Sequence, residues 1–253
     1  MPRFKDRVVI VTGSARGIGL AIALGFGREG AKVVLADIRN EQGITAENKI
    51  TQSGGQALFI HADVSNKSNV DSLVNETIRK FKKIDVLVNN AGICPFKNFL
   101  EIPAEMWDQV LEVNLKGFFL CSQAVAAEMI KQGIKGRIIN ISSISSIVGG
   151  EQQAHYCSSK AGINLLTASM AIALGPYGIT CNAILPGPIE TDINKEDLAD
   201  KEKREYFIKR TPLRRIGQPE DLVGPAMFFA SDDAGWCTGS TLVADGGILV
   251  NFQ

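Results

Sequence analysis

The sequence predicts a single α/β domain built on a doubly wound parallel sheet of seven strands with helices on both faces. Short apolar runs rich in β-branched residues alternate along the 253 residues with longer segments of helical periodicity. The runs have few polar positions, which is typical of parallel strands that are buried on both sides. A glycine-rich turn follows the first run, and an eight-stranded barrel would need one more strand–helix pair, so the doubly wound sheet is favoured.

Each strand is expected at an apolar run, and each helix is expected where the hydrophobic pattern changes to helical periodicity. The expected strands cover residues 8–11, 33–36, 57–60, 84–88, 137–141, 179–185 and 241–244. The expected helices cover residues 17–29, 41–52, 67–81, 103–132, 153–177 and 219–230. The charged stretch 194–215 is expected to pass over the active site, and we predict a mobile substrate flap over residues 188–215. No linker or repeat divides the chain, so residues 1–253 are expected to form one domain.

The composition argues against several classes of protein. Lys and Arg total 27 and Asp and Glu total 27, so the net charge gives no electrostatic basis for binding nucleic acid or an acidic membrane. No apolar stretch reaches membrane length, and the N-terminus has no signal-like hydrophobic segment. The five cysteines form no Cys-x-x-Cys pair, which fits a reducing cytoplasm. His61 and His155 stand alone, so we expect no metal site.

The turn Thr12-Gly-Ser-Ala-Arg-Gly-Ile-Gly19 lies between the first expected strand and the first expected helix. This context brings free backbone N–H groups and the positive end of a helix to one place, where a pyrophosphate can bind. The spacing is one residue longer than the common dinucleotide fingerprint, and the turn lacks the Gly-Lys-Ser/Thr of a phosphoryl-transfer loop. The alternative is a plain strand-to-helix turn that needs glycine for its backbone angles.

The end of the second strand indicates which dinucleotide is bound. Asp37 follows Gly19 by eighteen residues, where a carboxylate can accept hydrogen bonds from the adenosine ribose. The same carboxylate would repel a 2′-phosphate, so we expect NAD as the cofactor. Arg16 and Arg39 could hold that phosphate, which leaves NADP open as a second cofactor. Asp37 could also cap the helix that begins near Asn40.

A tyrosine and a lysine indicate the reaction. Tyr156 and Lys160 are four residues apart in an expected helix, so both side chains lie on one face. A free tyrosine, with a pKa near ~10, is a poor base at neutral pH, but an adjacent cation favours the phenolate and lowers that pKa. The phenolate can then take a proton from an alcohol. Together with the glycine-rich turn, this pair predicts an enzyme that transfers a hydride.

Other polar clusters follow the strand ends, where open α/β sheets bind ligands. They are Asp63-Val64, Asn89-Asn-Ala-Gly92, Ser142-Ser143 and Leu185-Pro-Gly-Pro-Ile-Glu-Thr191. Each could be only a turn or a cap, but their common position at one sheet edge indicates a shared site. Asn114 lies inside an apolar helical pattern, where it is either a satisfied core amide or a kink that exposes a carbonyl to water.

In combination these motifs resemble the short-chain dehydrogenase/reductase superfamily over essentially the whole chain. The resemblance rests on Thr12-Gly-x-x-x-Gly-Ile-Gly19, Asn89-Asn-Ala-Gly92, Asn114, Ser143, Tyr156-x-x-x-Lys160, Pro186-Gly and Asp245-Gly-Gly247. It implies a Rossmann-type sheet and a metal-free catalytic tetrad of Asn114, Ser143, Tyr156 and Lys160. Tyr156 would be the general base and Ser143 would position the hydroxyl and stabilise the alkoxide. Lys160 would lower the tyrosine pKa and bind the nicotinamide ribose, and Asn114 would hold a water that links Lys160 to solvent.

Ser143 is preferred to Ser142 because strand alternation turns one of the pair toward the site and because the family spacing to the tyrosine matches Ser143. The expected cofactor-binding residues are Gly13, Arg16, Gly17, Ile18, Gly19, Asp37, Ile38, Asp63, Val64, Asn90, Ala91, Gly92, Tyr156, Lys160, Pro186, Ile189 and Thr191. The expected substrate-contacting residues are Phe96, Ser143, Ser145, Gln153 and Tyr156. Hydrogen-bonding groups in such a pocket favour a hydroxylated ligand over a steroid or a fatty acyl chain.

Within the superfamily the chain is similar to bacterial L-rhamnose 1-dehydrogenases, most clearly from about residue 89 onward. The similarity rests on Asn89-Asn-Ala-Gly-Ile-Cys-Pro-Phe96, Gly149-Gly-x-x-x-Ala-His-Tyr156, Ala173-Leu-Gly-Pro-Tyr-Gly178 and Thr191-Asp-Ile-Asn-Lys-Glu-Asp-Leu198. It implies oxidation of an aldose at C1 to its lactone. The alternatives are a 3-oxoacyl carrier-protein reductase or broad-range carbonyl reductase, and a protein that binds dinucleotide without turnover. Ile93-Cys-Pro-Phe96 replaces the arginine-bearing run that is usual in the 3-oxoacyl reductases.

The expected helices over residues 103–132 and 153–177 carry more apolar residues than one buried stripe needs. These residues include Phe118, Phe119, Leu120, Leu165, Leu166, Met170 and Leu174. In members of the superfamily such helices commonly pair across a two-fold axis, so we expect a homotetramer with D₂ symmetry. The alternative is that both faces pack under neighbouring helices of the same chain.

Overall fold

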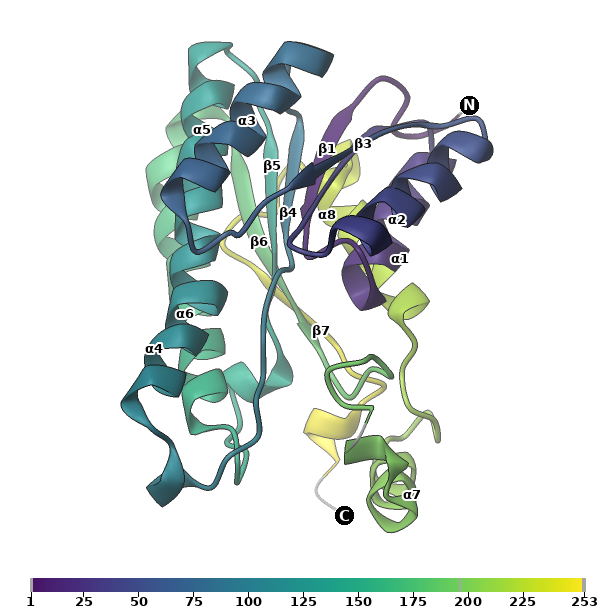
Figure 1. The fold of residues 1–253 in the computed structure, drawn as a ribbon, viewed down its shortest axis with the longest axis vertical. Coiled ribbons are helices and arrows are strands. Elements are labelled where there is room, and N and C mark those ends of the chain that lie inside the picture. The colour runs from purple at the N-terminus through teal and green to yellow at the C-terminus, as the bar shows by residue number, and fades with distance from the viewer. Residues whose placement is uncertain (1, 196, 252–253) are drawn as a thin grey trace.

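The computed structural model describes residues 2–195 and 197–251. Its centre is a parallel sheet of seven strands in the order β3-β2-β1-β4-β5-β6-β7, which confirms the expected doubly wound sheet (Figure 1). The strands are β1 (Val8–Thr12), β2 (Lys32–Asp37), β3 (Gln56–His61), β4 (Val86–Asn89), β5 (Arg137–Ile141), β6 (Thr180–Pro186) and β7 (Thr241–Ala244). The direction in which strands are added reverses between β1 and β4, and sheets of this kind bind ligands at that point.

Helices cover both faces of the sheet. They are α1 (Gly17–Arg28), α2 (Asn40–Gln52), α3 (Lys67–Phe81), α4 (Ala104–Leu111), α5 (Gly117–Lys131), α6 (Ala154–Leu174), α7 (Lys201–Arg210) and α8 (Val223–Ala230). In Figure 1, α1, α2 and α8 lie on one side of the sheet, and α3, α5 and α6 lie on the other. The helix α7 lies away from the sheet, below β7 in this view.

Alternation along the strands divides the core between these two faces. Val9 and Val11 of β1 belong to the cluster that packs against α1 and α8, whereas Ile10 belongs to the cluster under α3 and α5. All three side chains are completely buried, and each contributes about 1.5–3 kcal/mol relative to an exposed position. The two-sided burial explains why the strands read as continuous apolar runs.

The expected helix over residues 103–132 is helical over Ala104–Lys131, but a π-helical turn interrupts its α-helical hydrogen bonding. A π-helical segment, η2 (Glu112–Lys116), separates α4 from α5, and it places Asn114 in the protein interior. The expected helices over 153–177 and 219–230 are helical, but a 3₁₀ turn ends the first (Gly175–Tyr177) and begins the second (Pro219–Leu222). Short 3₁₀ turns are common at helix ends, and a single π-helical turn inserts one extra residue.

The 188–215 segment contains the helix α7, which the sequence reading did not predict. None of its residues is buried, so no apolar stripe marked it. Asp200 caps this helix, because its carboxylate accepts from the backbone N–H groups of Glu202 and Lys203. Residue 196 of this segment lies outside the described residues.

One helical stretch among the described residues, Ala104–Lys131, is long and apolar enough to cross a membrane by length and composition alone. Half of its most apolar window is buried inside the fold, as expected for a core helix. Of the seven apolar residues expected on the pairing helices, Phe118 and Leu120 are buried, whereas Phe119 and Leu165 are exposed at 43% and 72%. The extra apolar faces are therefore only partly covered within the chain.

Candidate active site

A pocket of about 540 Å³ lies between the glycine-rich turn, the start of α6 and the 188–215 segment. All the expected substrate-contacting residues line it, namely Phe96, Ser143, Ser145, Gln153 and Tyr156. So do many of the expected cofactor-binding residues, namely Ile18, Asn90, Gly92, Tyr156, Lys160, Pro186, Ile189 and Thr191. Asp37, Ile38, Asp63 and Val64 do not line it; Asp37 ends β2 and the other three follow β2 or β3, farther along the same sheet edge. The pocket lining also lacks Gly13, Arg16, Gly17, Gly19 and Ala91.

Tyr156 and Lys160 lie on one face in the first turns of α6, as their spacing predicts. The Lys160 Nζ lies 5.5 Å from the centroid of the Tyr156 ring and 5.3 Å from that of Phe118. It donates a hydrogen bond of 2.9 Å to the carbonyl of Ile141, at the end of β5. The ammonium is therefore held above the tyrosine ring by a backbone acceptor from the sheet.

The electrostatics of this pair differ from the expectation that Lys160 lowers the tyrosine pKa. Burial raises the pKa of Tyr156 and Cys94 raises it further, whereas a hydrogen bond with Ser143 lowers it. Burial also lowers the pKa of Lys160 to about 8, because the ammonium loses its hydration. The pKa of Tyr156 is therefore raised and not lowered, because the cost of burying the phenolate outweighs the hydrogen bond with Ser143.

The two serines after β5 have different surroundings. The Ser142 hydroxyl donates to the carbonyl of Lys160 at 3.1 Å, so it is engaged with α6. The Ser143 hydroxyl accepts from the backbone N–H of Ser145 at 3.0 Å and hydrogen-bonds Tyr156. This difference agrees with the alternation argument that selected Ser143 for the site.

Asn114 is buried and its side-chain amide is fully hydrogen-bonded, as the first of the two predicted alternatives requires. Its Oδ1 accepts from the backbone N–H of Ile93 at 2.8 Å, and its Nδ2 donates to the Ile93 carbonyl at 2.9 Å. The Nδ2 also donates to the Ser159 hydroxyl at 3.1 Å, and that hydroxyl donates to the carbonyl of Tyr156 at 2.7 Å. Asn114 thus ties the turn after β4 to the helix that carries Tyr156. Ser159 was not predicted, because its place in the network depends on the π-helical turn.

The glycine-rich turn packs directly on the turn after β4. A Cβ on Gly13 would lie 2.7 Å from the Ala91 Cα, and a Cβ on Gly19 would lie 2.2 Å from the Gly13 carbonyl oxygen, so only glycine fits either position. The Thr12 hydroxyl accepts from the N–H groups of Asn90 and Ala91 at 3.0 and 3.1 Å. Thr12 opens the motif, but sequence reasoning assigned it no role of its own.

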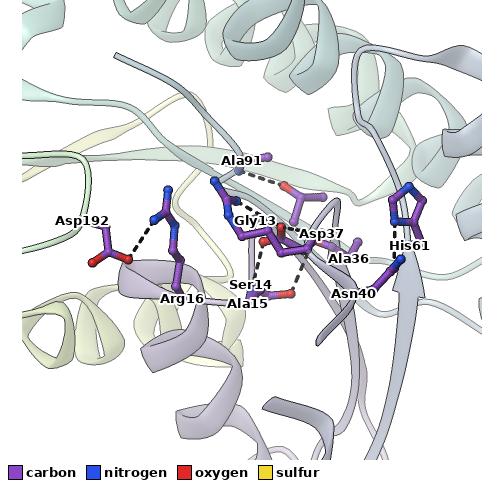
Figure 2. Close-up of polar contacts among 12 residues, drawn as sticks. Gly13, Ser14, Ala15, Arg16, Ala36, Asp37, Asn40, His61, Ala91 and Asp192 are labelled. Atoms are coloured by element: carbon purple, nitrogen blue, oxygen red, sulfur yellow. Dashed lines mark hydrogen bonds and ion pairs between the residues drawn. The ribbon is translucent and has the colours of Figure 1, made fainter. Parts of the chain in front are cut away.

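The nucleotide-binding residues fit a dinucleotide. No side chain caps the start of α1, so its first N–H groups face the glycine-rich turn as a phosphate would require. Asp37 is 4% exposed; its carboxylate accepts from the N–H of Ala15 at 3.0 Å and from the N–H and guanidinium of Arg39 at 3.0 and 3.3 Å (Figure 2). It does not cap α2, whose N-cap residue is Arg39.

Asp63 is already engaged within its own turn. Its carboxylate accepts from the N–H and the hydroxyl of Ser65 at 2.9 and 2.7 Å. One Asp63 oxygen, Oδ1, accepts both of these hydrogen bonds. The expected hydrogen bond from an adenine amino group to Asp63 stays a prediction. Among the described residues no group of His, Cys, Asp or Glu could hold a metal ion, and none of the five cysteines forms a disulfide.

Comparisons with known proteins agree with this geometry. The family model described as Enoyl-(Acyl carrier protein) reductase matches residues 13–249. The L-rhamnose 1-dehydrogenase (NAD(P)(+)) of Azotobacter vinelandii is 49% identical, with 98% of each chain covered. The 3-oxoacyl-[acyl-carrier-protein] reductase of Synechocystis sp. is 41% identical over 99% of this chain and 100% of its own. The gluconate 5-dehydrogenase of Burkholderia cenocepacia, solved with NADP and tartrate, superposes with a TM-score of 0.94 at 35% identity over 98% of this chain and 97% of its own.

Proposed function

Because the chain belongs to the short-chain dehydrogenase/reductase family, whose members act on CH–OH donors with NAD or NADP, we propose that it oxidises an aldose at C1, with L-rhamnose as the best substrate. The observation that carries the proposal is the convergence of Ser143, Tyr156 and Lys160 on one pocket wall, next to the side chains of Ser145 and Gln153. The first three groups fit proton transfer from an alcohol. The other two can hydrogen-bond a ligand that carries several hydroxyls.

In the proposed reaction Ser143 and Tyr156 hold the C1 hydroxyl of the cyclic sugar by hydrogen bonds. The hydroxyl proton passes to the Tyr156 oxygen while the C1 hydrogen leaves as a hydride, and the C1–O bond becomes the lactone carbonyl. The bound nicotinamide supplies the hydride acceptor. The reaction therefore converts one hemiacetal and one oxidised dinucleotide to one lactone, one reduced dinucleotide and one proton.

Lys160 and Asn114 support this step without contacting the sugar. Because burial raises the Tyr156 pKa, the phenolate that accepts the sugar proton needs a nearby positive charge, and we assign that role to the Lys160 ammonium above the ring. Asn114 holds the first turns of α6 through Ser159 and the Tyr156 carbonyl, so it is a positioning residue. The water that Asn114 is expected to hold stays a prediction.

The cofactor end of the site supports NAD as the preferred dinucleotide and NADP as a second one. The buried carboxylate of Asp37 is an acceptor for ribose hydroxyls and repels a 2′-phosphate. The guanidinium of Arg39 lies 3.3 Å from that carboxylate, so it offsets part of the repulsion. The relative from Azotobacter vinelandii uses either cofactor, according to its name.

The exposed apolar faces of α5 and α6 support a homotetramer. Phe119 on α5 is 43% exposed, and Leu165 and Ile172 on α6 are 72% and 81% exposed. Pairing of these helices across a two-fold axis would bury them and would stiffen the start of α6. A tetrameric mass in multi-angle light scattering at micromolar concentration is the expected result. A fully active monomer would refute the assembly. The absence of disulfides among the five cysteines supports the proposal of a cytoplasmic enzyme.

The function is tested by initial rates on a panel of alcohols with NAD and NADP side by side. The panel contains L-rhamnose, other aldoses, polyols and simple secondary alcohols in the oxidative direction. It also contains a 3-oxoacyl thioester with NADPH, because the Synechocystis relative is named for that activity. We expect the highest kcat/KM for L-rhamnose with NAD. A higher kcat/KM for the thioester would select the reductase alternative, and no turnover of any compound would refute both.

A further inference from the structure

An ion pair joins the nucleotide turn to the segment on the opposite side of the pocket. Figure 2 shows Arg16, at the start of α1, reaching to Asp192, and the Arg16 Nη1 lies 2.9 Å from the Asp192 Oδ2. The two residues are 176 positions apart in the sequence. Asp192 directly follows Thr191, which lines the pocket.

The side chain of Thr191 also lies close to the backbone of Gly17. Gly17 follows Arg16 and has a positive φ of 56°, and a Cβ built on it would lie 3.6 Å from the Thr191 Cγ2. Ile18 and Thr191 both line the pocket where the pyrophosphate of a dinucleotide is expected to bind. The ion pair therefore lies beside the place where the two walls of the cofactor cleft approach each other.

The turn that carries Asp192 is held in one shape by its neighbour Asn194. The Asn194 Oδ1 accepts from the N–H and the hydroxyl of Thr191 at 3.0 and 3.2 Å, and its Nδ2 donates to the Ile189 carbonyl at 2.8 Å. The beginning of the turn pairs with Gly217, whose carbonyl accepts from the Glu190 N–H at 2.9 Å. The turn can therefore move against the glycine-rich turn as a preformed unit.

We propose that Arg16 and Asp192 form a strap that holds residues 189–194 against the glycine-rich turn and slows dissociation of the bound dinucleotide. The proposal rests on the proposed function only in requiring that a dinucleotide binds; it is independent of the sugar. A dinucleotide in this cleft contacts both walls, so separating the walls is a step in its release. In this proposal neither side chain contacts the cofactor: each holds the segment of the other in place, so both are positioning residues.

The solvent exposure of the Arg16 and Asp192 side chains determines how large an effect on NADH dissociation we expect. The Arg16 and Asp192 side chains are 38% and 50% exposed, and ion pairs at this level of exposure are weak and are screened by salt. We therefore expect loss of the pair to raise the dissociation rate of NADH about two- to five-fold at low ionic strength. At about 0.5 M KCl the difference between the wild type and a strap variant should disappear.

The test is stopped-flow displacement of NADH from the full-length protein, followed by nucleotide fluorescence. The variants are Asp192→Asn, Arg16→Gln and the double variant, each measured at low and high KCl. Asp71→Asn is the matched control, because Asp71 forms an ion pair of similar exposure with Lys67 on α3, away from the pocket. The control should release NADH at the wild-type rate.

A strap predicts that the two single variants and the double variant release NADH equally fast, because either change breaks the same pair. Additive effects would show that Arg16 acts directly on the nucleotide, and they would overturn the proposal. Dissociation rates unchanged from wild type in Asp192→Asn would also overturn it. Failure of the wild type to bind NADH at all would refute the proposed function as well, so the two failures are distinguishable.

Discussion

The start of α6 and the 188–215 segment form opposite sides of the same pocket, but they are stabilised by different interactions. Asn114, Ser159 and Lys160 are at most 4% exposed, and their hydrogen bonds run to one another and to backbone groups. The 188–215 segment depends in addition on exposed ion pairs such as Glu190–Arg204, whose side chains are 42% and 37% exposed. Buried hydrogen bonds are costly to break, whereas exposed ion pairs contribute little and respond to salt. We call the start of α6 the rigid wall and the 188–215 segment the flexible wall, and we propose that the first fixes the chemistry and that the second adjusts ligand affinity.

The largest loss of activity is expected from Tyr156→Phe, at the start of α6. Removal of the hydroxyl deletes the proton acceptor, while the ring continues to pack beneath Lys160. We expect kcat for oxidation to fall at least about 10³-fold, with the Kd for NADH within about three-fold of wild type. Single-turnover absorbance at the NADH band measures the first quantity and fluorescence titration the second. Activity within about ten-fold of wild type would reject Tyr156 as the base.

The pH profile tests the same wall without a mutation. The Lys160 pKa is lowered to about 8 and the Tyr156 pKa is raised, so the pair as a whole loses its first proton as the pH rises through about 8. The form with a Lys160 ammonium and a Tyr156 phenolate carries the same number of protons as the form with a neutral amine and a phenol, and it is the form that we expect to react. Oxidation needs the pair as a base, so its kcat/KM should fall about ten-fold per pH unit below about 8 and level off above it. Reduction of the lactone should show the opposite trend.

Profiles between pH 6 and 10 in both directions, with sugar deuterated at C1 to confirm that hydride transfer is observed, measure this dependence. A break near pH 10, the value for an ordinary tyrosine, would contradict the coupling of the two groups. A profile that is flat in both directions would show that proton transfer to this pair does not limit the rate.

The sequence was sufficient to predict most of the rigid wall because its signals are local. The i, i+4 spacing of Tyr156 and Lys160, the strand alternation at Ser143 and the turn from Thr12 to Gly19 each depend on a few neighbouring residues. The five inner strands could be predicted for the same reason, since burial on both faces leaves an unbroken apolar run. The edge strands β3 and β7 are short apolar runs too, but most of their residues are not buried.

The parts that sequence did not predict depend on tertiary contacts. The π-helical turn forms where Asn114 reaches Ile93 and Ser159, and neither partner is within the same helix. The lowered pKa of Lys160 follows from burial that only the complete fold produces. The Arg16–Asp192 pair joins positions that no local pattern relates. α7 has an N-cap signal in Asp200, but no buried stripe follows it.

A smaller effect, on the choice between NAD and NADP, is expected from substitution of Asp37 at the cofactor end of the site. Asp37 is buried, yet it forms an ion pair with the half-exposed Arg39. Asp37→Ser removes an acceptor for the ribose and the repulsion toward a 2′-phosphate, while a serine can still accept from Ala15. We expect the ratio of kcat/KM for NAD to that for NADP to fall about ten- to a hundred-fold. An unchanged ratio would show that Asp37 serves only its local partners.

The smallest effect is expected from Glu190→Gln, which weakens the flexible wall alone. The Arg204 guanidinium donates to both Glu190 oxygens at 2.9 and 3.0 Å, and this contact holds the pKa of the carboxyl below its ordinary value. Glutamine keeps the shape but loses the charge, and exposed pairs contribute about 0–1 kcal/mol, so KM for the sugar should rise no more than about five-fold with kcat unchanged. Addition of about 0.5 M KCl should bring the wild type to the KM of the variant. A fall in kcat beyond about ten-fold would show instead that the 188–215 segment takes part in positioning the reacting groups, and the division between the two walls would then be wrong.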